Sequence, residues 1–516
     1  MPVAIPQKFN LAEHFLDRPA GAHPERVAIL GEGRPFSYGQ LRQMANRVGD
    51  ALRRGNCRPG ERVLLVLPDC AEFMAAFFGA TKVGAVAVPV NPMTRAADYA
   101  YYLADCRARL AIVHAIALAE FRTAAEGKPL DAVVVVGADK AENQMLRWED
   151  WLASASDQLE PHSTAATDTA FLLYTSGSGG TPKGAVHQHK DMLVTSESFA
   201  QGVLGLRSED RTFSVSKLFF AYGLGNGMYF PFSVGASTIL NPERPKPDRV
   251  LELVARHRPT VFFAVPTFYA AILRAADEGA AADFSSVRLA VSAGEALPAE
   301  ICDQFRRRFG LEILDGIGST EMLHMFIASR PGKARPGSCG VEVPNYDAVI
   351  VDEQGQAVPT GEIGNLCVRG QSAFAGYWNK PELTARAKRD DWVITGDKFF
   401  RDREGYYYYC GRADDMMKVA GMWVSPGEVE NALLGHPQVA EAAVVAHTEL
   451  GLTKPVAYVV LRDSGQAGPQ LVSELQEFVR QRLPSYKVPQ AVHFLAELPK
   501  TATGKIQRFK LRSAAG

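Results

Sequence analysis

The sequence has no surplus of charge of either sign. Fifty-six Lys and Arg residues face fifty-seven Asp and Glu residues, which leaves a formal net charge of −1 at pH 7. It also has no basic block of the kind that neutralises phosphates along a nucleic acid. We therefore expect no nucleic-acid partner.

The cysteines show no pairing pattern. There are seven of them, an odd number, and none has CxxC spacing; they stand at positions 57, 70, 106, 302, 339, 367 and 410. This arrangement argues against a disulfide framework and against a zinc site. Free thiols in a reducing cytoplasm are the expectation.

Long apolar runs are also lacking. The longest candidate, residues 73–90, is interrupted by Lys82 and two glycines, and the first ten residues, MPVAIPQKFN, lack the charged start and apolar run of a secretory signal. We expect no membrane partner and a cytoplasmic protein.

The length and composition indicate a soluble globular protein with several units. The chain has 516 residues, with 47% hydrophobic and 22% charged residues, and at about 150 residues per domain this predicts three or four units.

The first 160 residues alternate between helical and strand patterns. Ser37 precedes an amphipathic helix, 62–67 (RVLLVL) is an apolar strand, 71–81 is a helix and 85–89 is a strand. Apolar strands that alternate with helices predict a parallel sheet covered on both faces. We expect the Lys and Glu residues of this region to lie on the solvated surface, because none of them cluster.

The pattern of predicted strands and helices changes twice after residue 250. Strands at 260–265 and 287–292 open onto turns, and a third strand at 311–314 leads into residues 315–326. After position 331 the short strands at 348–351, 364–368 and 406–409 favour a small antiparallel barrel or sheet. The last hundred residues predict a separate α/β unit, with a helix at 428–434, strands at 439–445 and 457–461, and an amphipathic helix from 471.

One stretch, 171–184 (FLLYTSGSGGTPKG), has the composition of a phosphate-binding loop. An apolar strand, 171–174, leads into glycines, hydroxyl residues and Lys183. Glycines let backbone N–H groups turn toward an anion, and lysine supplies a point charge. Pro182 and Gly184 flank that lysine where a Walker loop has Gly and Ser or Thr, so the Walker interpretation fails. Alone, the stretch could equally be a flexible surface loop.

Other polar clusters lie where strands are expected to end. Residues 292–296 form a candidate nucleotide rim, because ligands of open α/β sheets bind beyond the carboxyl ends of strands. In GSTE (318–321), a hydroxyl could donate to phosphate and a carboxylate could hold Mg²⁺. TGD (395–397) and GRADD (411–415) are predicted to be turns.

The aromatic stretch 211–237 is a candidate ligand wall. Most aromatic residues belong to cores. Here, however, Phe219, Phe220 and Tyr222 are followed by Gly223, Gly225 and Gly227, whose backbone can approach a ligand closely. A flat hydrophobic substrate would suit such a surface.

In this order, YTSGSGGTPKG, GSTE, TGD, GRADD and PKTATGK resemble the acyl-adenylate-forming superfamily over essentially the whole chain. Within it the sequence is most similar to the benzoate-CoA ligases, through KLFFAYGLGN (217–226), SAGEALP (292–298), DGIGSTEMLH (315–324) and ELPKTATGKIQRFKLR (497–512). The resemblance implies an α/β fold. A large N-terminal adenylation domain, 1–413, would consist of stacked, mostly parallel α/β subdomains and a small β-barrel. A small mobile α+β lid domain, 414–516, would follow it.

The resemblance also implies two half-reactions and their residues. An aryl carboxylate would attack ATP to give an aryl-adenylate, and the CoA thiol would then displace AMP. Lys505, Thr320 and Glu321 would be catalytic, and Glu321 would bind Mg²⁺. The other implied residues are, for phosphate, Thr175, Ser176, Gly177, Ser178, Gly180, Thr181 and Lys183; for the nucleotide, Gly294, Glu295, Ala296, Asp315, Gly316, Asp397 and Arg412; and for the hinge and CoA side, Asp414, Lys418 and Gly421.

The resemblance also implies an aryl pocket, and the sequence departs from the family pattern at three of the implied site positions. The pocket would comprise Phe220, Ala221, Tyr222, Gly294, Gly318, His324 and Met325, with His324 as a donor near the substrate carboxylate. Gly179 removes one hydroxyl from the phosphate loop, and Ile317 replaces an aromatic residue that stacks on adenine. Phe220 replaces a histidine, while the pliable Met325 could tolerate ring substituents.

Several alternatives stay open. The enzyme could load an aryl acid onto a carrier-protein thiol instead of CoA, or the chain could be a non-catalytic regulator that binds ATP or an aromatic acid. The expected cofactors are ATP, Mg²⁺ and CoA, and the expected partner is a small aromatic carboxylic acid. Ring substitution and assembly, for which a homodimer is one option, are not determined.

Overall fold

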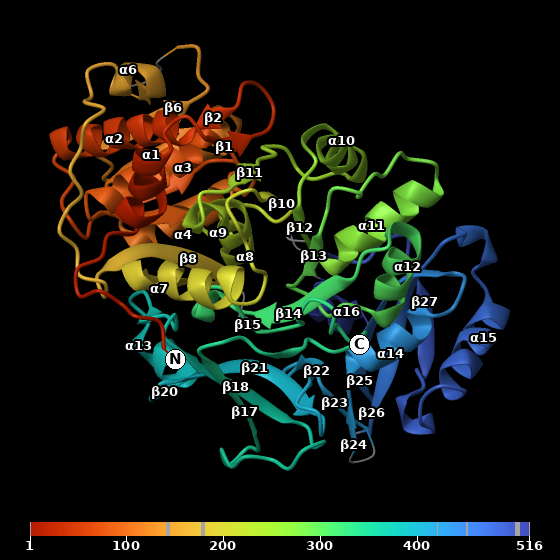
Figure 1. Ribbon diagram of the computed structural model, residues 1–516. Helices are drawn as coiled ribbons and strands as arrows, with labels where there is room; N and C mark the ends of the chain where they lie inside the picture. Colours follow the sequence, from red (N-terminus) through yellow and green to blue (C-terminus); the bar gives the residue numbers. More distant parts are fainter. Residues whose placement is uncertain are drawn as a thin grey trace.

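The computed structural model describes residues 2–140, 145–176, 181–419, 422–449, 452–500 and 506–514. Two large sheets form the first part of the chain, and an antiparallel sheet and a small C-terminal unit follow them (Figure 1). This is the mixed α/β architecture that the sequence predicts. None of the helices in the described ranges has both the length and the apolar composition needed to span a bilayer.

An eight-stranded sheet, in the order β19-β9-β8-β4-β3-β5-β6-β7, carries the predicted phosphate loop. The strands from β3 to β8 run parallel, and β9 and β19 are antiparallel additions at one edge. Its strands are β3 (Arg62–Val66), β4 (Val86–Pro89), β5 (Leu110–His114), β6 (Ala132–Val136), β7 (Leu146–Arg147), β8 (Thr169–Ser176), β9 (Pro182–Gln188) and β19 (Gly376–Tyr377).

Both faces of this sheet are buried, as the near-continuous apolar strands predict. Val63 and Leu65 of β3 join the main core with α2 and α3, whereas Leu64 and Val66 pack with residues of α4 and α5. Ser37 and Gln40 form a capping box at the start of α2. The helices around the sheet are α1 (Arg18–Ala22), α2 (Tyr38–Arg54), α3 (Ala71–Lys82), α4 (Ala96–Cys106), α5 (Leu118–Ala125), α6 (Trp148–Leu152) and α7 (His189–Thr195).

A nine-stranded sheet in the order β16-β15-β14-β13-β12-β10-β11-β1-β2 supplies the predicted nucleotide rim. Its strands are β1 (Val27–Leu30), β2 (Phe36–Ser37), β10 (Arg211–Ser214), β11 (Ser237–Ile239), β12 (Val261–Ala264), β13 (Leu289–Ser292), β14 (Ile313–Gly318), β15 (Met325–Ala328) and β16 (Val341–Glu342). The helices that accompany it in sequence are α8 (Ala221–Leu224), α9 (Phe230–Ser233), α10 (Pro247–His257), α11 (Pro266–Asp277) and α12 (Ala299–Phe309).

The predicted antiparallel unit is a five-stranded sheet. It contains β17 (Tyr346–Val351), β18 (Gly364–Gly370), β20 (Lys388–Arg389), β21 (Trp392–Arg401) and β22 (Tyr407–Arg412), with α13 (Pro381–Ala387) beside it. The N-terminal segment reaches this part of the molecule, because the backbone N–H of Val3 donates to Gln371 Oε1 at 2.9 Å.

The last hundred residues pack around their own core, shown in blue in Figure 1. Two buried clusters of this region contain no residue before Met417 among those described. Its elements are β23 (Met417–Val419), β24 (Met422–Val424), α14 (Pro426–Leu434), β25 (Val439–Glu449), β26 (Leu452–Leu461), α15 (Pro469–Arg480), β27 (Ala491–Phe494) and α16 (Arg508–Ala514).

The expectation that the N-terminal lysines are all solvated is wrong for Lys82. Its side chain is 2% exposed, and its Nζ lies 2.8 Å from Asp17 Oδ1 and 2.6 Å from Asn46 Oδ1. Burying an ammonium requires partners that replace its water. Here the two partners, Asp17 and Asn46, come from two other elements, so spacing along the chain could not reveal them.

We expect Lys82→Ala to destabilise the fold by about 3–5 kcal/mol, because it leaves the Asp17 carboxylate without its buried partner. Denaturant unfolding measures this change. The matched control is Arg95→Ala, which removes a pair with Glu120 whose arginine side chain is 84% exposed, and should cost at most about 1 kcal/mol. Equal losses for the two variants would contradict the assignment.

Candidate active site

The predicted phosphate loop joins two arms of a β-hairpin. Strands β8 and β9 pair antiparallel, with Thr175 opposite Lys183 and Ser176 opposite Pro182. A Walker loop instead leads into a helix, so the hairpin agrees with the rejection of that motif. Thr181 is exposed at the start of the second arm. Gly177, Ser178, Gly179 and Gly180 lie outside the described residues.

Thr320 and Glu321 lie on a 3₁₀ turn, Thr320–Met322, immediately after β14. Three successive carbonyl groups of this turn accept hydrogen bonds from other parts of the chain. The Thr320 carbonyl faces His187 Nε2 at 2.8 Å, the Glu321 carbonyl accepts the Phe374 N–H at 2.8 Å, and the Met322 carbonyl accepts the Ser372 hydroxyl at 2.9 Å. The turn is therefore fixed along its whole backbone.

His187 is a buried part of this arrangement that the sequence analysis did not identify. Its Nδ1 lies 2.9 Å from Asp191 Oδ2, and its ring stacks on Phe171 of β8 at 5.1 Å between centroids. A carbonyl oxygen can only accept, so Nε2 carries a proton and donates to Thr320. The four-residue spacing of His187 and Asp191 was the available signal for this pair. The same spacing is common in surface helices, so it did not indicate a buried hydrogen bond.

A tyrosine that the sequence analysis also missed joins the hairpin to the turn. Tyr377 donates its hydroxyl hydrogen to Glu321 Oε1 at 2.5 Å, and Lys183 Nζ donates to the same hydroxyl at 3.3 Å. The structure thus brings the predicted phosphate lysine and the predicted metal carboxylate to one rim. The sequence offered no signal for this tyrosine beyond the short pattern GYW at 376–378.

Asp397 and Arg412, the predicted ribose pair, face each other across two strands. They are register partners on β21 and β22, and Arg412 Nη1 lies 3.1 Å from Asp397 Oδ1. The prediction that TGD is a surface turn is wrong, because residues 395–397 lie within β21. For GRADD the prediction is partly wrong, since Gly411 and Arg412 end β22 and only 413–415 turn. A bulge beside Asp397 and the positive φ of Gly396 (75°) account for the turn-like composition.

The predicted nucleotide rim lies at the ends of two neighbouring parallel strands. Ser292 of β13 is the register partner of Asp315 of β14. Gly294, Glu295 and Ala296 follow β13, and Gly316 follows Asp315 within β14. Burial raises the pKa of the Asp315 carboxyl well above its usual range. Within the described residues its Oδ1 is buried without a hydrogen-bond partner.

Two of the predicted aryl-pocket residues, Tyr222 and Gly318, lie next to His324. The His324 ring contacts Tyr222 at 5.5 Å between centroids, and a Cβ on Gly318 would come within 2.5 Å of the His324 carbonyl oxygen. Phe220 packs against Phe219 at 4.5 Å. Ala221 begins α8 next to Tyr222, and Met325 is 1% exposed within the main core.

His324 is neutral in this setting. Its ring is buried among aromatic side chains, and burial lowers its pKa to about 3. Its Nε2 is paired with Asn226 Oδ1 at 3.1 Å, and the amide oxygen can only accept. Nε2 thus faces Asn226 and not an open ligand site, and the expected donation to a substrate carboxylate stays a prediction.

The hinge and lid residues are described only in part. Asp414 is exposed in the turn after β22, and Lys418 lies in β23. Lys505 and Gly421 lie outside the described residues. Over the described ranges, no group of three or more His, Cys, Asp or Glu side chains could hold a metal ion.

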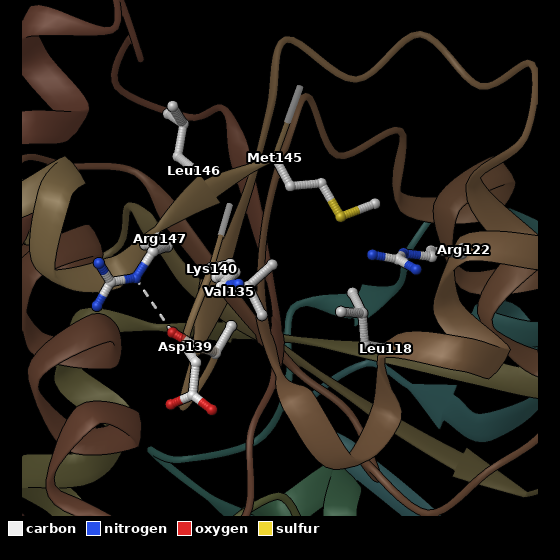
Figure 2. Close-up of a pocket in the computed structure, with 9 residues that line it drawn as sticks. Leu118, Arg122, Val135, Asp139, Lys140, Met145, Leu146 and Arg147 are labelled. Atoms are coloured by element: carbon white, nitrogen blue, oxygen red, sulfur yellow. Dashed lines mark hydrogen bonds between the residues drawn. The ribbon is translucent and has the colours of Figure 1, made fainter. Parts of the chain in front are cut away.

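Two cavities border the eight-stranded sheet. One, of about 330 Å³, lies beside β6 and β7 and is lined by Leu118, Arg122, Val135 and Arg147, among others (Figure 2). It contains none of the predicted site residues. The second, of about 670 Å³, is lined by Val186, by residues 375–381, and by Thr384, Ala385, Lys388 and Asp390.

Two protein families and several curated proteins match the sequence. The AMP-binding enzyme family matches residues 16–378, and the AMP-binding enzyme C-terminal domain matches residues 428–505. A benzoate–CoA ligase of Thauera aromatica is 43% identical over 99% of this chain and 97% of its own length. A 4-hydroxybenzoate–CoA/benzoate–CoA ligase of Rhodopseudomonas palustris is 41% identical over 98% of this chain and 94% of its length.

Two solved structures of CoA ligases are similar to this chain over nearly its whole length. The anthranilate CoA ligase AuaEII in complex with anthranoyl-AMP superposes with a TM-score of 0.94 at 40% identity, over 99% of this chain and 98% of that one. A benzoate CoA ligase from Burkholderia xenovorans LB400 superposes with a TM-score of 0.90 at 41% identity, over 98% of this chain and all of that one.

The fixed turn leads to a prediction for His187. His187→Leu should lower the free energy of unfolding by about 1–3 kcal/mol, because it removes the buried His187 hydrogen bonds to the Thr320 carbonyl and the Asp191 carboxylate. His187→Gln, which keeps a donor, should recover part of this loss. Denaturant unfolding measures the stability, and amide hydrogen exchange of the peptide around residues 319–323 reports on the turn. Unchanged exchange in His187→Leu would show that His187 does not hold it.

Proposed function

The chain belongs to the AMP-binding enzyme family, and from that membership we propose that it is an ATP-dependent aryl-CoA ligase. Its substrate is benzoate or a small substituted benzoate, such as a hydroxybenzoate. The acid is converted to its CoA thioester through an aryl-adenylate, with release of pyrophosphate and AMP. The names of the relatives that match over nearly their whole length support this assignment.

The observation that carries the proposal is the meeting of Lys183 and Glu321 at one rim. A phosphate-loop cation and a metal-capable carboxylate come from distant parts of the sequence, and both bond to the Tyr377 hydroxyl. Joining a carboxylate to a polyphosphate mainly requires neutralisation of negative charge. This rim contains the groups that such a step needs.

In the first half-reaction, a carboxylate oxygen of the acid attacks the α-phosphorus of ATP. A new P–O bond forms as the bond to the β-phosphate breaks, and pyrophosphate leaves. Lys183 and the hydroxyl residues of the hairpin bind the β- and γ-phosphates, and Thr320 binds the α-phosphate. Asp397 accepts from the ribose hydroxyls while Arg412 orients it.

Glu321 fits a role as the protein ligand of Mg²⁺. A magnesium ion at such a site is held by one or two carboxylates together with substrate phosphates and water. Among the residues that the structure describes, Glu321 offers one carboxylate and no group of three or more His, Cys, Asp or Glu side chains could hold a metal ion. When bound, the ion neutralises charge on the phosphates. Glu321 would hold the ion from a fixed position, because Phe374 holds its backbone carbonyl and Tyr377 holds its Oε1.

In the second half-reaction, the sulfur of CoA attacks the carbonyl carbon of the adenylate. The thioester bond forms, the thiol proton is released and AMP leaves. We propose that residues 414–516 act as a mobile domain that turns about Asp414, withdraws Lys505 and presents the segment around Lys418 and Gly421 to CoA. The separate C-terminal core supports this division.

The aromatic surroundings of His324 support a flat acid as the substrate. Tyr222, Phe199 and Phe230 all contact its ring, and Gly225 is required beside it because a Cβ there would come within 2.6 Å of the ring. Such surfaces recognise shape and apolar area, with few polar groups to fix orientation.

A panel of acids tests the substrate class. Purified protein with ATP, Mg²⁺ and CoA should release pyrophosphate with benzoate and hydroxybenzoates at least about tenfold faster than with acetate or cinnamate, because each extra or missing methylene-sized group in a fitted pocket is worth about 1–3 kcal/mol. Equal turnover of acetate would contradict the pocket assignment. Adenylate formation without any thioester from free CoA would favour a carrier-protein thiol as acceptor.

Lys505 gives a second test. Lys505→Ala should slow adenylation at least about a hundredfold, because a positioned cation opposite developing negative charge is worth that much. The same variant should still convert a supplied aryl-adenylate to the thioester. Rapid-quench assays of the two half-reactions measure these rates. Loss of both steps would contradict the proposed domain rotation.

A further inference from the structure

Tyr377 lies between the two oppositely charged groups of the proposed phosphate and metal sites. Its hydroxyl is 2.5 Å from Glu321 Oε1 and 3.3 Å from Lys183 Nζ, and that ammonium also lies 4.4 Å from the centroid of the tyrosine ring. Among the described residues, Lys183 and Glu321 form no ion pair with each other. Their only link in this part of the chain runs through the phenol.

The chemistry of the three groups gives the link a direction. An ammonium can only donate and an ionised carboxylate can only accept. Lys183 therefore donates to the tyrosine oxygen, and the single tyrosine proton goes to Glu321. Burial, with the Glu321 carboxylate adding to it, raises the pKa of the Tyr377 hydroxyl, so the phenol stays a neutral donor.

The position of Tyr377 is fixed from several sides. Strand β19 pairs with β9, and Tyr377 is the register partner of Ala185, two residues from Lys183. Its backbone N–H donates to Thr384 Oγ1 at 2.8 Å, and its ring packs edge-on against Phe374 at 4.8 Å. Phe374 in turn donates its N–H to the Glu321 carbonyl. The segment 374–377 therefore contacts Lys183 through the Tyr377 hydroxyl, and contacts Glu321 through both that hydroxyl and the Phe374 backbone N–H.

We propose that Tyr377 is a positioning residue. Its hydroxyl holds the Lys183 ammonium and the Glu321 carboxylate near each other but prevents them from forming a direct ion pair. This inference rests on the proposed function. Without the hydroxyl, the ammonium could pair directly with the carboxylate, and each would neutralise the group that should meet phosphate or metal. With the hydroxyl in place, one carboxylate oxygen is oriented by Tyr377 and the other remains for a divalent cation.

The test compares Tyr377→Phe with Tyr408→Phe. The first variant keeps the ring that packs on Phe374 and removes only the hydroxyl. The control removes a hydroxyl that donates to Asp402 Oδ2 at 3.2 Å in the antiparallel sheet, where β22 pairs with β21. Both changes are the loss of one oxygen from a tyrosine bonded to an acid.

The first measurement is cation binding without turnover. Free Mn²⁺ is followed by electron paramagnetic resonance in the presence of the full-length protein and α,β-methylene-ATP, which cannot form an adenylate. Tyr377→Phe should raise the apparent Kd for Mn²⁺ about five- to tenfold, and Tyr408→Phe should leave it unchanged. An unchanged Kd in Tyr377→Phe would overturn the proposal.

The second measurement separates the half-reactions. In Tyr377→Phe the Mg²⁺ concentration that half-saturates adenylation should rise about five- to tenfold, whereas the KM for the aryl acid and the rate from supplied aryl-adenylate to thioester should stay within twofold. A fall in both half-reactions together would mean that Tyr377 serves packing only. Absence of any adenylate from the unmodified protein would instead overturn the proposed function, which keeps the two failures distinct.

A double variant shows whether Tyr377 acts through Glu321. If it does, adding Tyr377→Phe to Glu321→Gln should change the Kd for Mn²⁺ less than twofold, because the carboxylate that the hydroxyl orients is already lost. A further five- to tenfold rise in the double variant would mean that the two residues act independently, and would overturn the inference.

Discussion

The antiparallel pairing at the edge of the eight-stranded sheet is the constraint on which the site depends. Strand β9 pairs on one side with β8, which closes the phosphate hairpin, and on the other with β19, which carries Tyr377. Because backbone register determines which side chains are neighbours, this short edge places the Lys183 ammonium beside the tyrosine. A shift of one residue in β19 would turn Tyr377 to the opposite face.

The second sheet contributes the other half of the rim and is joined to the first through backbone groups. The carbonyls of the turn Thr320–Met322 accept from His187 at the end of β9, from Phe374 and from Ser372. Such bonds position Thr320 and Glu321 through the backbone, which leaves the Thr320 side chain and the second carboxylate oxygen of Glu321 for a ligand. Pre-organised groups of this kind avoid reorganisation at the moment of reaction.

Charge is handled differently in the core and at the rim. Lys82 is buried with Asp17 and Asn46, so its charge is fully paired. Lys183 and Glu321 are instead connected through a neutral phenol. Buried direct pairs are costly to separate, and a ligand that must bind between two charges is better served by groups that have not already neutralised each other.

Composition, periodicity and turn chemistry were sufficient to predict the parallel sheet, the antiparallel unit, the C-terminal unit and the order of the polar motifs, because these properties depend on residues close together in the sequence. The GSTE cluster and the glycine-rich loop were recognisable for the same reason, but the turn and the hairpin that carry them were not. Tyr377, His187 and the burial of Lys82 were not, and TGD was wrongly predicted to be a turn. Each of these depends on a partner supplied by a distant strand or helix, and only the packing of the sheets determines which distant groups meet.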